Sequence, residues 1–143
     1  MMIQNSAHIF FPVIILILGT LVFTAIMGIT RLKAARSGAV EYRIFKVYRN
    51  KQNMPHTMLK MSNHYDNLMT MPIMFYVIVT MIYVTHNVDK TFIFLAWGYV
   101  ATRLVHTFIH LGQNHPLKRF FAFGTGVMIL FAMTIRLTFL LAT

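Results

Sequence analysis

Residues 91–111, TFIFLAWGYVATRLVHTFIHL, combine the length of a membrane-spanning helix with a set of strongly polar side chains. A helix needs about 20 mostly apolar residues to cross the hydrocarbon core of a bilayer. Arg103, His106 and His110 nevertheless lie inside this stretch. A charge in hydrocarbon costs roughly 3 kcal/mol or more, so it normally has a partner or a function. The stretch therefore predicts a membrane helix whose polar face either binds a ligand or ties helices together.

The rest of the chain is equally apolar. Of its 143 residues, 57% are hydrophobic and 11% are charged, which is unlike an ordinary soluble domain. The absence of cysteine excludes disulfides, thiolate metal sites and cysteine nucleophiles. We therefore expect a single all-α domain, an integral membrane four-helix bundle over residues 1–143. Its expected spans are 8–30, 58–83, 91–111 and 120–142, with boundaries good to about four residues.

The distribution of basic residues predicts the orientation of these spans. The net charge is +10, and residues 31–60 alone carry eight basic residues against one acid. The turn after the third span adds Lys118 and Arg119. By the positive-inside rule, the basic loop 31–57 faces the cytoplasm and both termini face the opposite side. We expect this whole loop to be partly helical and amphipathic, with Val40, Ile44 and Val47 toward lipid. Its charges are expected to meet lipid headgroups rather than nucleic acid.

Two polar stripes are expected to meet inside the bundle. Asp66 on the second span and Arg103 on the third lie at a similar depth, ~12–13 Å from the cytoplasmic end at ~1.5 Å per residue. One interpretation is a buried ion pair that fixes helix register. The other is an anion site in which Arg103 binds a carboxylate, because its donors form a planar fork. The stripes comprise Asn63, Asn67 and Thr70, with Asp66 at the flank, and Tyr99, Arg103, His106 and His110.

A metal site is a third possibility. His106 and His110 have the i, i+4 spacing of a helical ligand pair, and His64 or Asp66 would be needed to complete a site for zinc, copper or iron. That spacing is common and no third ligand is assured, so we expect no metal. The twelve methionines are expected to fill apolar gaps rather than to bind copper. The segment 124–126, Gly-Thr-Gly, is expected to permit close helix packing.

Two segments carry a resemblance to a known family. Residues 67–76, NLMTMPIMFY, resemble the second-helix motif of the MAPEG family, the membrane-associated proteins of eicosanoid and glutathione metabolism. In the family's bacterial branch this motif reads Asn-Leu-x-Glu-x-Pro-x-x-Phe-Tyr. Residues 103–110, RLVHTFIH, are similar to the family's arginine followed by Tyr or His three and seven residues later. Asn114 and Arg119 match the turn that follows, and the resemblance is strongest over residues 63–119.

The resemblance implies a homotrimer that binds glutathione between subunits and transfers it to, or reduces, lipophilic electrophiles. Arg119, or its neighbour Lys118, would be the catalytic cation that stabilises the glutathione thiolate. The residues expected to bind glutathione are Asn67, Arg103, His106 and His110, together with Asp66 if it takes over from the motif glutamate.

Two positions depart from the family pattern. Thr70 stands where the motif has its glutamate, and Asn63 stands where the family has an arginine. The glutamate would pair with the glutathione amine and the arginine with a carboxylate. Each lost charge-assisted contact is worth roughly 1.5–3 kcal/mol. The alternative function is therefore a non-catalytic structural or accessory subunit of a larger membrane complex, with the fold kept and the glutathione site degenerate.

Overall fold

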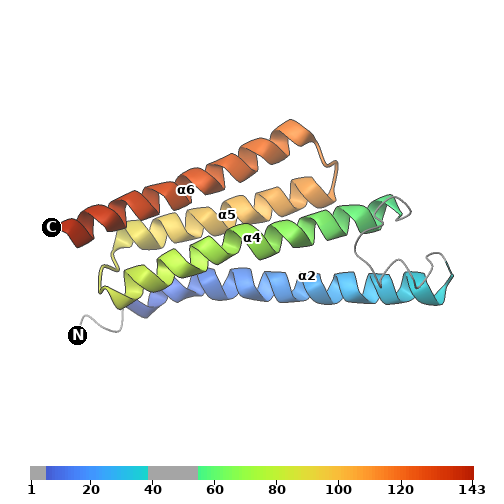
Figure 1. The fold of residues 1–143 in the computed structure, drawn as a ribbon, viewed down its shortest axis with the longest axis horizontal. Helices are drawn as coiled ribbons and strands as arrows, with labels where there is room; N and C mark the ends of the chain where they lie inside the picture. Colours follow the sequence, from blue (N-terminus) through green and yellow to red (C-terminus); the bar gives the residue numbers. More distant parts are fainter. Residues whose placement is uncertain (1–5, 39–54) are drawn as a thin grey trace.

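The computed structural model describes residues 6–38 and 55–143, and within them every regular element is a helix. A short 3-10 helix, η1 (Ala7–Ile9), leads into the first of four long helices (Figure 1). These are α2 (Phe10–Arg36), α4 (His56–Val84), α5 (Lys90–Leu111) and α6 (Pro116–Ala142). The predicted all-α, four-helix class is confirmed. Most of the loop expected to be amphipathic, including Val40, Ile44 and Val47, lies outside the described residues.

Each long helix overlaps one expected span and is long and apolar enough to cross a membrane. α2 continues to Arg36, six residues past the expected end of the first span. The helices run alternately up and down, so that the start of α2 and the end of α6 lie at one end of the bundle (Figure 1). The end of α2, the start of α4 and the α5–α6 turn lie at the other. Lys60 links two of these segments, because its Nζ donates to the carbonyl oxygen of Gly112 at 2.9 Å. The basic residues that close α2 and open α6 thus share one end of the bundle, as the positive-inside argument requires.

Local sequence accounts for the helix ends around α5. Asp89 is the N-cap of α5, and its Oδ1 accepts a hydrogen bond from the backbone N–H of Phe92 at 2.8 Å. Asn114, which follows the end of α5, has a positive φ of 50°, a conformation that asparagine tolerates better than most residues. Pro116 then opens α6 in the first turn, where proline removes no helical hydrogen bond. The short α5–α6 connection is therefore fixed by residue type.

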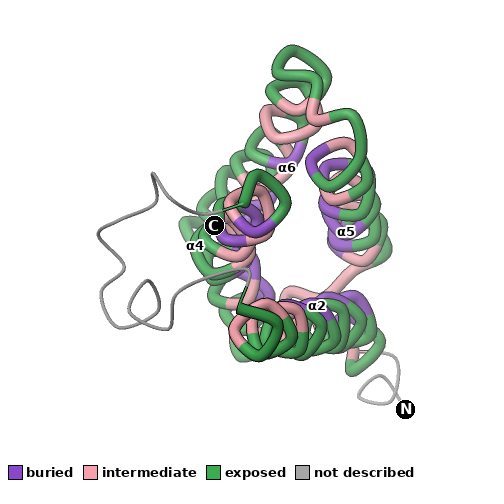
Figure 2. Tube along the Cα trace, turned by 90° about the vertical axis from the view of Figure 1, so that its right-hand side faces the viewer, coloured by how far each residue is buried: buried purple, intermediate pink, exposed green. Residues whose placement is uncertain are grey.

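The buried side chains line the inside of the bundle, and the outside is largely apolar. Phe75 of α4 stacks on Tyr99 of α5 with ring centroids 4.5 Å apart, in the middle of the core. Figure 2 shows the buried residues on the inward faces and exposed residues around the rim. Phe94, Phe108 and Phe139 are among many large apolar side chains that point outward. Such a surface suits lipid rather than water.

Candidate functional site

An open pocket of about 640 Å³ lies where α4, α5 and the start of α6 converge. It is near the end of the bundle that carries the α5–α6 turn. Four of the predicted site residues, from three different helices, line it together. The lining consists of Asn63, Asn67, His106, His110, Pro116, Leu117, Arg119, Phe120 and Phe123.

Arg119 is the cation of this pocket. It sits in the first turn of α6, is half-buried, and its Nη1 donates to Asn114 Oδ1 at 3.0 Å. Lys118, the other candidate from the sequence, is exposed and is not among the lining residues. This hydrogen bond to Asn114 orients the guanidinium of Arg119. Of the two cations, Arg119 is therefore the one placed to meet an anion in the pocket.

Arg103 takes a different position from the one expected. It is buried, and its Nη2 donates to the carbonyl oxygen of Phe123 on α6 at 3.1 Å. Its guanidinium carbon lies 5.0 Å from the ring centroid of Tyr99 and 5.4 Å from that of Phe123. Arg103 borders a second, smaller cavity of about 90 Å³ instead of the main pocket. Arg103 therefore joins α5 to α6 in this structure.

This orientation also changes the expected relation between Arg103 and Asp66. Arg103 turns its guanidinium toward α6, whereas Asp66 lies on an exposed face of α4. Asp66 is not among the residues that line the main pocket. Its backbone carbonyl accepts a hydrogen bond from Thr70 Oγ1 at 2.6 Å, within the same helix. The structure therefore does not bear out a buried Asp66–Arg103 pair. Arg103 bonds to α6 instead, and Asp66 belongs to a polar stripe on the outside of α4.

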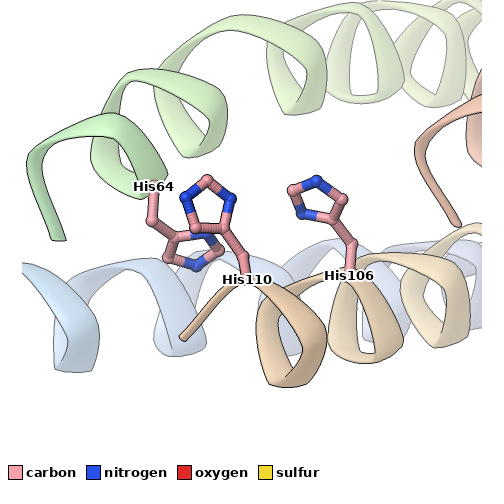
Figure 3. Close-up of side chains that lie close together, drawn as sticks. All are labelled: His64, His106 and His110. Carbon is pink, nitrogen blue, oxygen red and sulfur yellow. The ribbon is translucent and has the colours of Figure 1, made fainter. Parts of the chain in front are cut away.

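Three histidines form a compact group beside the pocket (Figure 3). His106 and His110 come from one face of α5, as predicted, and His64 comes from α4. The ring of His64 lies 5.2 Å from that of His110 and 6.1 Å from that of His106, centroid to centroid. Phe23 of α2 packs edge-on against His64 at 4.7 Å. The sequence offered His64 only as one possible third metal ligand, and the structure places it beside His106 and His110.

The apolar wall of the pocket was not anticipated. Leu117, Phe120 and Phe123 follow one another at three-residue intervals on α6 and supply that wall. Their spacing was the available signal, since residues three apart share a helix face. The sequence predicted only an apolar span in this region, with no role for this face of the helix. Together with the polar α4 and α5 side, they make the pocket amphipathic.

A comparison with protein families identifies the chain. The sequence model of the MAPEG family matches residues 9–139, which include α2, α4 and α5 in full and most of α6. The chain belongs to the MAPEG family. It is therefore a MAPEG-type integral membrane protein that crosses the bilayer several times, and the resemblance found in the sequence is confirmed at the family level. No curated protein and no solved structure matched the chain.

The charge of the pocket distinguishes this MAPEG chain from the motif it resembles. Among the described residues, the side chains that line the cavity include Arg119 and two histidines but no carboxylate. Asn63, one of the two departures from the family pattern, lies directly in the lining. Thr70, the other departure, lies on the exposed side of α4. The pocket as described thus favours an anionic group and offers no acidic partner to an amine.

Proposed function

We propose that this MAPEG protein is a glutathione-dependent transferase or peroxidase that acts on lipophilic electrophiles. The observation that carries the proposal is the convergence of Arg119, Asn67, His106 and His110 on one cavity of about 640 Å³. Pockets for small ligands in proteins are typically about 300–1,000 Å³, so a tripeptide is a suitable size of ligand.

The chemistry assigned to the site follows from the positions of its side chains. Arg119 would hold the glutathione sulfur as thiolate, because a fixed neighbouring cation stabilises the charged form of a thiol. Asn67 and the histidines would donate or accept hydrogen bonds along the peptide. The apolar wall of Leu117, Phe120 and Phe123 would hold the electrophile. In transfer, the sulfur attacks the electrophilic carbon and the leaving group departs with the electron pair of the broken bond.

The proposed working unit is a trimer. Asn63, Asp66 and Thr70 lie on the exposed face of α4, a helix that is long and apolar enough to cross a membrane. Polar side chains at membrane depth usually face other protein rather than lipid. A neighbouring subunit on this face would bring the α4 stripe and the pocket into one interface. The lipophilic substrate would then reach the site from the bilayer between subunits.

The decisive experiment measures glutathione binding and its ionisation in detergent-purified protein. We expect glutathione to raise the thermal midpoint and to show thiolate absorbance in the ultraviolet at neutral pH. Arg119→Gln should remove the thiolate signal, whereas Lys118→Gln, the same charge change one residue away on an exposed side chain, should keep it. Absence of any thermal shift at millimolar glutathione would refute the proposal.

The absence of a carboxylate among the pocket-lining residues favours a second candidate. In it, the protein is an accessory subunit that retains the MAPEG fold without binding glutathione. It predicts that purification in mild detergent yields a stable larger complex with another membrane protein. Recovery of the protein only as a glutathione-binding homo-oligomer would rule this second candidate out.

A further inference from the structure

The group of His64, His106 and His110 is more compact than hydrogen bonding requires. One ring nitrogen from each histidine lies within 4.8 Å of those from the other two. The three side chains are almost fully buried, with 1%, 4% and 1% of their surface exposed. Figure 3 shows the rings gathered between α4 and α5. Burying three imidazoles in such a small volume destabilises the fold unless a common partner satisfies their ring nitrogens.

Three of the six ring nitrogens lack such a partner among the described residues. Both Nδ1 and Nε2 of His64 are buried without a hydrogen-bond acceptor or donor there, and so is Nδ1 of His110. Buried polar side-chain atoms in folded proteins are nearly always satisfied, and unsatisfied ones call for an explanation such as an ion. Phe23 closes one side of His64 with an aromatic ring. Buried lone pairs left without a hydrogen-bond partner are what a metal ion would satisfy.

We propose that His64, His106 and His110 bind a late first-row transition-metal ion such as Zn²⁺, with the fourth coordination position facing the main pocket. Neutral imidazole suits zinc, copper, nickel and iron, whereas magnesium and calcium need oxygen ligands, of which this group has none. Two of the ligands, His106 and His110, also line the pocket, which gives an exogenous ligand access to the ion. Three histidines with one open position is the arrangement of a catalytic rather than a closed structural zinc site.

The geometry needs only side-chain adjustment. With Zn–N bonds of about 2.0–2.1 Å, tetrahedral ligand nitrogens lie about 3.4 Å apart. The present separations of up to 4.8 Å must therefore shorten by about 1.4 Å at most. His106 and His110 are one helical turn apart on α5, the spacing at which two side chains already face the same point. Small rotations of the three rings close the gap without moving the helices.

The surrounding charge selects the fourth ligand. Arg103 and Arg119 act electrostatically on His106, and Arg119 and Lys60 act on His110. Three neutral ligands would leave the full double charge of the ion among these cations. An anion in the fourth position, a hydroxide or a thiolate, offsets that charge and lies within reach of Arg119 in the pocket. The inference stands without glutathione, because water can supply the hydroxide.

Cobalt(II) is the probe that tests the site, because tetrahedral Co²⁺ absorbs strongly in the visible range. The full-length protein, purified through a tag without histidine, should bind one Co²⁺ per chain, and Zn²⁺ should displace it. His64→Gln should weaken binding by more than the ~10–100-fold that follows loss of a residue hydrogen-bonded to a metal ligand. His56→Gln, an exposed histidine eight residues earlier on the same helix, should change nothing.

A second variant guards against loss of the fold. His64→Cys introduces the only thiol of the chain and should keep Co²⁺ bound, while adding a sulfur-to-cobalt charge-transfer band in the near ultraviolet. Adding glutathione to the wild-type cobalt complex shows whether the fourth ligand is hydroxide or thiolate, because only a bound thiolate adds that charge-transfer band. The proposal is overturned if wild-type protein gives no tetrahedral cobalt spectrum, or if the spectrum survives in His64→Gln.

Discussion

Gly126 of α6 lies directly against the guanidinium of Arg103 of α5, so that a Cβ at Gly126 would overlap that group. The same Cβ would lie 2.9 Å from Thr102 Oγ1. Hydrogen is therefore the only side chain that leaves room for the buried arginine. This contact explains the expected close packing at 124–126 and assigns it to one of the two glycines.

The first prediction concerns this contact. Gly126→Ala should destabilise the protein by about 1–3 kcal/mol, as expected for overpacking that pushes Arg103 off Phe123. Gly124→Ala is the matched control, because nothing lies within 4 Å of a Cβ there. Alanine favours a helix over glycine by up to ~1 kcal/mol, so the control should be neutral or stabilising. Thermal unfolding in one detergent compares the two, and equal midpoints would contradict the packing described here.

The second prediction restores a family residue. If the trimer places the exposed α4 face at the glutathione site, Thr70→Glu should raise the affinity for glutathione about 10-fold, since one charge-assisted contact is worth roughly 1.5 kcal/mol or more. Thr70→Gln is the neutral control of the same shape. Titration calorimetry with glutathione and with an analogue lacking the amine measures the effect. The gain should vanish for the analogue, and an equal gain for both ligands would contradict the assignment.

The third prediction concerns the opposite end of the bundle. Arg136 of α6 forms an ion pair with Asp89, and its guanidinium lies 5.2 Å from the ring centroid of Phe92. Because both side chains are about 40% exposed, their coupling should not exceed ~1 kcal/mol. A double-mutant cycle with Asp89→Asn and Arg136→Gln measures it. Asparagine retains the N-cap of α5, so the cycle reports on the ion pair alone. A coupling of zero would mean that the pair does not stabilise the fold.

The fourth prediction tests the orientation in the membrane. The chain has no cysteine, so single cysteines can be introduced and labelled with an impermeant reagent. Ser37→Cys and Gln113→Cys lie at the basic end of the bundle and should be protected in intact cells, whereas His86→Cys should react. All three should react after the membrane is opened. Labelling of Ser37→Cys but not of His86→Cys in intact cells would reverse the proposed sidedness.

The helices and their order were predictable, and so was the composition of individual helix faces. Tyr99, Arg103, His106 and His110 were predicted to share a face of α5, and all four are buried. A period of 3.6 residues fixes which side chains share a face, because it depends only on one helix. It does not say which neighbouring helix that face meets. This is why Asp66 of α4 was one of two predicted partners of Arg103, the other being an anionic ligand, although the guanidinium meets α6.

The same limit applies to the second span. The sequence shows a polar stripe on α4 that consists of Asn63, Asn67 and Thr70. His64, one position after Asn63, is not part of that stripe. His64 lies about 100° from Asn63 around the helix axis, toward the inside of the bundle. Only the packing of α4 against α5 shows that His64 meets His110. Contacts between helices depend on rotation and depth of packing, which a single sequence does not specify.

The ion pair between Asp89 and Arg136 also has a consequence for the order of folding. The α5–α6 hairpin is closed at one end by the short turn before Pro116 and at the other by this pair. Asp89 precedes Arg136 by 47 residues, a stretch that contains all of α5 and most of α6. The pair can therefore form only after both helices have entered the bilayer and folded back on each other, which makes it a late step of membrane insertion.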